Sequence, residues 1–547
     1  MALSRVLFIA GSDCSGGAKE CLTSELVSEG SVCALADDIF STPPFIGTGQ
    51  PTNNANSGLE ADQKTAAAHC VYAMAATTAL TAQNTTGVYD VHCTPPDFVG
   101  RQIDLCVEDV GVDVVKTGML ATDETIRVVA GRLRKHGLDK VVLDPVMIST
   151  SGAKLLPDDA VATLCRELLP LALVVTPNIP EARVILQAAG QTPVEVSCAA
   201  DMKTLGKAVQ ALGPKWVLIK GGHVPFRKDL TLAKSDDERK IVMDVLCGPE
   251  GEIISVQSPF QESRNTHGTG CTLASTVAVN LANGRSVPDA VRAACNYIEV
   301  GIRTAPGLGS GHGPLNHFHS MHVLPFAPGH FVEWLLARPD VRPVWDEFVN
   351  HPFVRGLGTG TLPLESFKGY ITQDYIYLIH YTRAYALSSY KGRTAAQVRD
   401  GAEVAAKVSQ EMAMHKAYCT TFGISEAEVM ATPELPACTA YTRYILDIGA
   451  SEDWLALQIA QAPCLLGYGE IGAVWASHPE LKKEENPYWS WVANYSSENF
   501  VAAVDFGKKV LEEYIVKQTP DRIEELVKIF IHATRMEIEF WEMYPTV

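Results

Sequence analysis

A glycine-rich heptapeptide, NTHGTGC at residues 265–271, stands directly before an apolar, small-residue stretch at 272–282. Glycines at a helix start expose backbone N–H groups, and the helix dipole adds to their attraction for an anion. The segment therefore predicts an anion hole for a phosphoryl group in transfer. A plain helix cap is the competing interpretation. The sequence contains no GxxxxGK[ST] segment, so a Walker-type phosphate loop is excluded.

Polar residues also follow several short apolar runs in this half of the chain. Asp144 follows one run, Asn178 and Glu181 follow another, and Lys220 follows a third. A lysine, carboxylates and an asparagine at neighbouring strand ends would suit nucleotide phosphates and Mg²⁺. Taken one at a time, each could equally be a solvated loop residue. A further glycine turn at residues 11–17 would let a ligand approach the backbone closely.

The second half of the chain carries a different set of reactive side chains. Cys464 lies in a helical pattern, where a stabilised thiolate could act as a nucleophile, although most helical cysteines are inert. Asp374 and Tyr377 are three residues apart, which places them on one helix face. Aromatic rings could sandwich a planar heterocycle while carboxylates move protons, with core packing as the alternative. The other candidates for such a site are Tyr441, Tyr495 and Glu537.

The elements that must position these residues differ between the two halves. Short apolar runs alternate with helical patterns up to about residue 320. The runs are Val6–Ala10, Val114–Lys116, Lys140–Leu143, Leu173–Val175 and Trp216–Ile219. They predict an α/β domain with a mostly parallel sheet and flanking helices, whose ligands bind at the carboxyl ends of the strands. From about residue 325 the spacing is helical throughout, which predicts an all-α helical bundle.

Composition excludes several classes of protein. The 547 residues carry a formal net charge of −18, so a nucleic-acid partner is not expected. No apolar run reaches the roughly 18 residues of a membrane span, so no membrane partner is expected either. The 14 cysteines include no Cys-x-x-Cys pair, which favours reduced thiols and a cytoplasmic location.

Two segments stand outside these patterns. Residues 19–57 mix polar and turn residues and are interpreted as a loop insertion. Residues 307–330 are rich in glycine, proline and histidine and contain the domain boundary, with residues 320–330 interpreted as the linker. The histidines around this linker match no metal-ligand spacing and are interpreted as solvated. They are His312, His317, His319, His322 and His330.

Eight ordered motifs in residues 1–319 resemble the hydroxymethylpyrimidine/phosphomethylpyrimidine kinases of the ribokinase superfamily. They are GSDxSGG, LEADQK, TALTAQNT, KTGML, LDPVM, TPNIPEA, IKGGH and NTHGTGC. The resemblance implies ATP and Mg²⁺ as cofactors, with phosphoryl transfer to a hydroxymethyl group and then to the resulting phosphate. Asp62 and Gln83 would hydrogen-bond the aminopyrimidine, Gly11 and Met119 would line its pocket, and Cys271 would be the catalytic base. Residues for ATP and the anion hole would be Asp144, Asn178, Glu181, Lys220, Gly268, Thr269 and Gly270, with Mg²⁺ near Asp144 and Glu181.

Residues 331–547 resemble the thiaminase II (TenA-like) family. The motifs are HPFVRGLGTGTLP, FKGYITQDYIYL, PACTAYTRY, APCLLGYGEIG, NPYWSWVANYSS and RMEIEFW. The resemblance implies a haem-oxygenase-like helical bundle with neither haem nor a covalent cofactor. Cys464 would add to the pyrimidine, Glu537 would move protons and Asp374 would engage the ring. The remaining substrate-binding residues would be Tyr377, Tyr441, Tyr468 and Tyr495.

Together the two resemblances predict a bifunctional, homo-oligomeric enzyme of thiamine biosynthesis and salvage. It would phosphorylate hydroxymethylpyrimidine and would release that compound from thiamine or from aminopyrimidine degradation products. In the kinase family the glycine turn runs directly into the helix of Asp62, so residues 19–57 either loop out or come from an unspliced gene segment. Three alternatives stay open: a hydrolase whose kinase is disabled by the insertion, a pyrimidine-binding regulator without catalysis, and a pyridoxal kinase.

Overall fold

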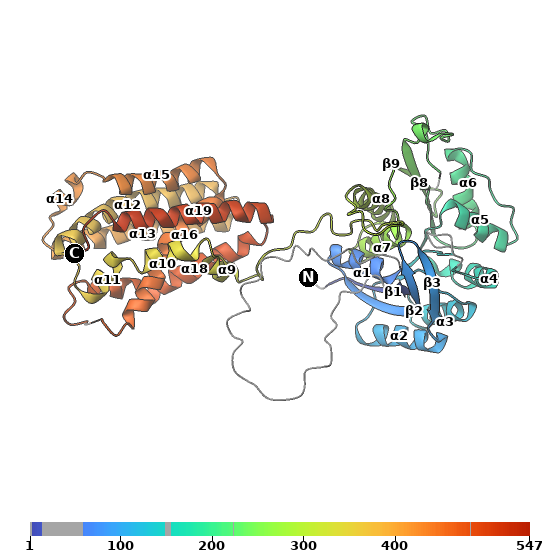
Figure 1. Cartoon of the computed structure of the whole chain (residues 1–547), viewed down its shortest axis with the longest axis horizontal. Helices are drawn as coiled ribbons and strands as arrows, with labels where there is room; N and C mark the ends of the chain where they lie inside the picture. Colours follow the sequence, from blue (N-terminus) through green and yellow to red (C-terminus); the bar gives the residue numbers. More distant parts are fainter. Residues whose placement is uncertain (1–2, 14–57, 148–154, 223, 482) are drawn as a thin grey trace. The chain divides into compact units, whose positions relative to one another are not determined.

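The chain divides into two compact units, Met1–Met321 and His322–Val547, which are shown in the computed structural model of Figure 1. The structure describes residues 3–13, 58–147, 155–222, 224–481 and 483–547. The predicted insertion at 19–57 lies outside the described residues, as does most of the glycine turn at 11–17.

The first unit is built on a sheet whose described strands run in the order β3-β2-β1-β4-β5-β6-β7-β8-β9. Strands β2, β1, β4, β5, β6 and β7 are parallel, whereas β3, β8 and β9 extend the sheet with antiparallel pairings. The strands are β1 (Arg5–Asp13), β2 (Tyr72–Asn84), β3 (Gly87–Cys93), β4 (Val114–Thr117), β5 (Val141–Leu143), β6 (Val174–Val175), β7 (Trp216–Ile219), β8 (Ile241–Cys247) and β9 (Ile253–Pro259).

Helices cover both faces of this sheet (Figure 1), because alternate strand residues point to opposite sides. On β1, Leu7 and Ile9 join one apolar cluster, while Val6 and Phe8 join the other. The first cluster lies under α2 (Pro96–Asp109), α3 (Asp123–Lys135), α4 (Asp158–Glu167), α5 (Ile179–Ala188) and α6 (Ala199–Gln210). The second lies under α1 (Leu59–Ala68), α7 (Thr269–Ala282) and α8 (Val287–Arg303). Two 3₁₀ turns lie at Leu169–Leu171 and Asp236–Glu238.

The second unit contains helices and no strands among its described residues. Its long helices are α12 (Leu364–Lys391), α13 (Ala395–Thr421), α15 (Pro436–Ser451), α16 (Trp454–Ala476), α18 (Glu498–Ile515) and α19 (Pro520–Trp541). The shorter ones are α9 (Phe331–Ala337), α10 (Arg342–Val349), α11 (Pro352–Thr359), α14 (Glu426–Ala431) and α17 (Trp489–Tyr495). Helix α16 packs against α15, α17, α18 and α19, so apolar residues surround it on most sides.

The predicted fold class is confirmed, with an α/β unit followed by an all-α bundle. Among the described residues, no helix has both the length and the apolar character that crossing a bilayer requires.

Candidate active sites

A cavity of about 700 Å³ opens at the carboxyl ends of the parallel strands in the first unit. Met119, Asp144 and Lys220 reach it from the ends of β4, β5 and β7. The sheet therefore gathers residues that are far apart in the chain. The predicted site residues among those lining the cavity are Gly11, Gln83, Met119, Asp144, Asn178, Glu181, Lys220, Gly268, Thr269, Gly270 and Cys271.

The charged floor of this cavity is a lysine between two carboxylates. Lys220 Nζ lies 2.9 Å from Asp144 Oδ1 and 3.8 Å from Glu181 Oε2. Burial raises the pKa of Glu181 and Asp144 adds to that effect, although Lys220 opposes it. The second carboxylate oxygen of Asp144, Oδ2, is buried without a hydrogen-bond partner. An acceptor left bare in this way suits a cation or a ligand donor.

Helix α7 begins at the same cavity with its N–H groups uncapped by any side chain. The N-cap Gly268 has a left-handed φ of 77°, which glycine adopts without strain. A Cβ atom at Gly270 would lie 3.3 Å from Lys220 Nζ, so a side chain there would crowd the lysine. Backbone N–H groups, the helix dipole and an ammonium thus converge, and this arrangement suits a phosphate.

Cys271 stands in the first turn of α7 and lines the cavity. Burial raises the pKa of its thiol to about 12, although the nearby charge of Lys116 works in the opposite direction. The thiol is therefore neutral at physiological pH before any substrate enters.

Gly11, Gln83 and Met119 also line the cavity. A Cβ atom at Gly11 would approach Met119 Cε to 2.7 Å, so a side chain there would push the end of the Met119 side chain aside. Gln83 Nε2 lies 3.1 Å from Nε2 of the buried His267, which holds the amide in place. His267 belongs to the NTHGTGC segment but was not among the predicted site residues.

Two predicted residues have their side chains engaged within the protein. Asp62 does not line the cavity; its fully buried carboxylate binds Lys116 Nζ at 2.8 and 3.1 Å and accepts a hydrogen bond from Ser275. The contact of Asp62 with the pyrimidine stays a prediction. Asn178 does line the cavity, but its Oδ1 accepts the backbone N–H of Glu181 at 2.8 Å as the N-cap of α5.

In the second unit, five helices carry the predicted residues, namely α12, α15, α16, α17 and α19. Tyr441 on α15 donates a 2.6 Å hydrogen bond to Glu537 on α19, and its ring stacks on Tyr377 of α12 at 5.1 Å. Burial raises the pKa of Glu537 to about 8; the Tyr441 hydrogen bond works against this rise and Asp374 adds to it. Glu537 is therefore protonated at neutral pH and can donate a proton.

Cys464 on α16 faces the same tyrosines. Burial raises the pKa of its thiol and the nearby Glu537 adds to this, whereas the hydroxyls of Tyr377 and Tyr381 work in the opposite direction. Tyr377 and Tyr381 stack at 5.4 Å on consecutive turns of α12. The resting site thus holds a neutral thiol beside a neutral carboxyl group.

Asp374, Tyr468 and Tyr495 complete the predicted set. Asp374 Oδ2 lies 3.6 Å from His415 Nδ1, and burial lowers the pKa of His415 to about 4, so this histidine is neutral. The rings of Tyr468 and Tyr495 meet at 4.9 Å, and the Tyr468 hydroxyl lies 3.4 Å from that of Tyr370. The site is therefore lined by aromatic rings with two carboxyl groups among them.

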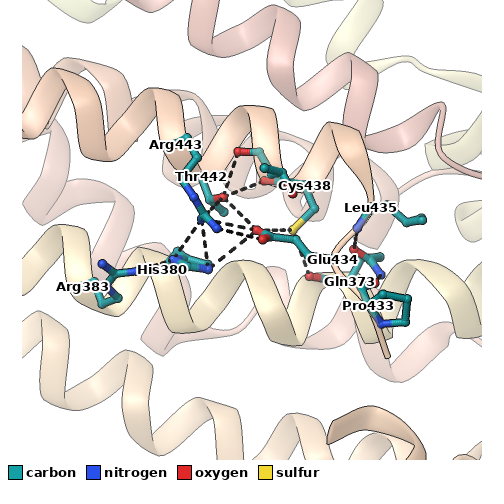
Figure 2. Close-up of polar contacts among 10 residues, drawn as sticks. Gln373, His380, Arg383, Pro433, Glu434, Leu435, Cys438, Thr442 and Arg443 are labelled. Carbon is teal, nitrogen blue, oxygen red and sulfur yellow. Dashed lines mark hydrogen bonds and ion pairs between the residues drawn. The ribbon is translucent and has the colours of Figure 1, made fainter. Parts of the chain in front are cut away.

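Figure 2 shows how the neighbouring polar residues fix α12 against α15. The Gln373 amide donates to the Pro433 carbonyl and accepts from the Leu435 N–H, both at 2.9 Å. Glu434 accepts from Arg443 Nη2 at 2.9 Å and from Thr442 Oγ1 at 3.1 Å. Gln373 directly precedes Asp374, so this clamp sets the position of Asp374 relative to Tyr441.

Comparison with protein families matches the two units separately. The phosphomethylpyrimidine kinase family matches residues 53–316, and the TENA/THI-4/PQQC family matches residues 338–546.

Relatives align over most of the chain. A Schizosaccharomyces pombe protein, provisionally named hydroxymethylpyrimidine/phosphomethylpyrimidine kinase 2, is 40% identical over 99% of this chain and 91% of its own. The Saccharomyces cerevisiae hydroxymethylpyrimidine/phosphomethylpyrimidine kinase THI20 is 32% identical over 89% of this chain and 93% of its own. Among solved structures, the ADP complex of Bacillus subtilis pyridoxal kinase is 29% identical over 58% of this chain and 98% of its own, with a TM-score of 0.44.

Proposed function

The chain belongs to the hydroxymethylpyrimidine/phosphomethylpyrimidine kinases that carry a TENA/THI-4 domain, and from this membership we propose that it is a bifunctional enzyme of thiamine biosynthesis and salvage. Residues 1–319 phosphorylate 4-amino-5-hydroxymethyl-2-methylpyrimidine and then its monophosphate. Residues 331–547 release the same pyrimidine from thiamine or from its aminopyrimidine breakdown products. The observation that carries this proposal is the alignment of both domains, in this order, with relatives along nearly their whole length.

The cavity of the first unit fits ATP with Mg²⁺. The bare Oδ2 of Asp144 and the Glu181 carboxylate would hold the cation, and Lys220 with the uncapped start of α7 would hold the phosphates. ATP supplies the phosphoryl group, and Mg²⁺ neutralises its charge. Gly11, Gln83 and Met119 orient the pyrimidine. Cys271 stands beside the anion hole as the proposed proton acceptor, a role that requires its thiolate, and the nearby charge of Lys116 favours that form.

In the second unit, Cys464 adds through sulphur to a ring carbon while Glu537 delivers its proton to a ring nitrogen and takes up the proton of the thiol in return. The leaving group then departs from the exocyclic methylene, an amine taking its proton from Glu537, and water adds there and returns a proton to Glu537. Loss of the Cys464 sulphur restores the ring, so that hydroxymethylpyrimidine and the free amine or thiazole are the products. Tyr377, Tyr441, Tyr468 and Tyr495 hold the ring, and Asp374 engages it.

The decisive test is ATP-dependent phosphorylation of hydroxymethylpyrimidine by the full-length chain, followed by mass spectrometry. We expect the diphosphate as final product, and a Cys464→Ser variant should form it at the same rate. Pyridoxal added in excess should compete weakly. A folded chain that forms no phosphate but still hydrolyses aminopyrimidines would support the alternative in which residues 19–57 disable the kinase.

The hydrolase is tested on the same preparation by release of ammonia from 4-amino-5-aminomethyl-2-methylpyrimidine without ATP. Cys464→Ser should abolish this release, whereas Cys271→Ser should leave it unchanged. Absence of both activities in a chain that binds the pyrimidine would favour the regulator. A cytoplasmic location and a homo-oligomeric state belong to the same proposal, and sedimentation velocity of the purified chain checks the second.

A further inference from the structure

Gln461 on α16 is 2% exposed, yet neither atom of its side-chain amide has a hydrogen-bond partner. Burying an amide with both its donor and its acceptor unused is costly, and buried polar groups are almost always satisfied. The absence of a partner therefore needs an explanation, since an apolar side chain would pack there at lower cost.

The position of Gln461 places it at the proposed hydrolase site. Gln461, Cys464 and Tyr468 follow one another at spacings of three and four residues, which puts them on one face of α16. The Tyr381 hydroxyl contacts both residues: it donates a hydrogen bond to the backbone carbonyl of Gln461 at 3.4 Å, and it also lies beside Cys464. The amide thus lies one helical turn from the nucleophile.

The neighbouring glutamine on the same helix, unlike Gln461, has a hydrogen-bond partner for its side chain. Gln458, one turn earlier, donates a 2.7 Å hydrogen bond to Ser388 of α12 and so has an ordinary structural role. No such partner exists for Gln461 among the described residues. Its amide lies buried one helical turn from Cys464 with its hydrogen-bonding capacity unused.

We propose that Gln461 binds the aminopyrimidine ring of the hydrolase substrate through its amino edge. This inference rests on the proposed hydrolase function. A carboxamide offers an acceptor and a donor side by side, and a 4-aminopyrimidine presents an amino N–H next to a ring nitrogen. The two patterns pair through two hydrogen bonds, as glutamine does with adenine. Both orphaned atoms of Gln461 are satisfied at once, and the second amino hydrogen stays free for Asp374.

The test uses the full-length chain with the variants Gln461→Met and Gln458→Met, and it measures ammonia release from 4-amino-5-aminomethyl-2-methylpyrimidine. We expect Gln461→Met to raise KM by about tenfold or more and to raise the thermal unfolding midpoint, because it removes an unsatisfied amide. Gln458→Met should lower the midpoint and leave KM unchanged. In the wild-type chain, the analogue without the 4-amino group should have a higher KM than the amino compound. This difference between the two compounds should be smaller in Gln461→Met.

An unchanged KM in Gln461→Met, with an unchanged preference for the amino compound, would overturn the inference and leave Gln461 with a structural water only. A wild-type chain that releases no ammonia would contradict the proposed hydrolase instead. In that case protection of Cys464 from iodoacetamide by the same compound is followed by mass spectrometry. Protection that is equal in the wild-type chain and in Gln461→Met, or absent from both, would also overturn the inference. Gln461→Leu replaces Gln461→Met if the latter does not fold.

Discussion

At the scale of single residues, burial sets the protonation states in the hydrolase site more than neighbouring charges do. Glu537 and Cys464 are both neutral at rest, because burial disfavours their ionised forms. A site prepared in this way donates a proton before it accepts one. The hydrogen bond from Tyr441 sets how far the Glu537 pKa can rise.

We therefore predict that kcat/KM for ammonia release falls as the pH rises through about 8, where Glu537 loses its proton. Tyr441→Phe removes a hydrogen bond that lowers this pKa, so the alkaline limb should move to higher pH. Glu537→Gln should reduce kcat about 10²–10⁴-fold and abolish that limb. A rate that increases above pH 8 would show that Glu537 acts as a base.

The raised pKa of Glu537 also makes the stability of the folded chain depend on pH. Because the pKa of Glu537 in the folded chain lies above its ordinary value of 4.5, the folded chain keeps a proton that the unfolded chain releases as the pH rises from 4.5 to about 8. The contribution of Glu537 to stability is therefore full below 4.5 and is lost by about pH 8. Glu537→Gln should flatten this part of the stability profile.

At the scale of elements, the buried Asp62–Lys116 pair joins α1, β4 and, through Ser275, α7. Burial is the largest single effect on Lys116 and lowers its pKa, but the neighbouring acidic groups, with Asp62 first among them, together outweigh burial and raise the pKa overall, so the ammonium persists. Ser275 is one turn below Cys271 on α7. The pair thus holds the start of α7 against the sheet.

We predict that Lys116→Met destabilises the first unit by about 3–5 kcal/mol, because it leaves the Asp62 carboxylate buried without a counter-charge. Urea unfolding followed by loss of kinase activity measures this change. The double variant Lys116→Met with Asp62→Leu should recover much of the loss. Ammonia release by the second unit serves as the control and should not change.

The sequence predicted the elements better than it predicted individual contacts. Runs that end at Asp144 and Lys220 could be identified because buried parallel strands are continuously apolar. The partner of Asp62 could not be identified from the sequence, because Lys116 lies 54 positions away and only the sheet brings the two residues together. Gln461 gives no sequence signal at all: its lack of a partner is visible only once every neighbouring side chain is placed.

At the scale of the whole molecule, each unit builds its apolar clusters from its own residues. The bundle cluster runs from Phe326 to Trp541, and the clusters of the first unit lie between Val6 and Cys295. Each unit therefore has the core that an independent domain requires.

We predict that a fragment of residues 322–547 folds and releases ammonia with a kcat/KM within about twofold of the full chain. Far-ultraviolet circular dichroism and the ammonia assay check this. A fragment that aggregates or loses activity would mean that the bundle depends on the first unit.

Separate cores also change what a denaturation experiment on this protein can report. Heat or urea should remove the two activities at two different midpoints, with a half-folded chain populated between them. A single melting temperature would then be an average over two events. A substitution in one unit should shift one midpoint and leave the other as an internal standard in the same tube.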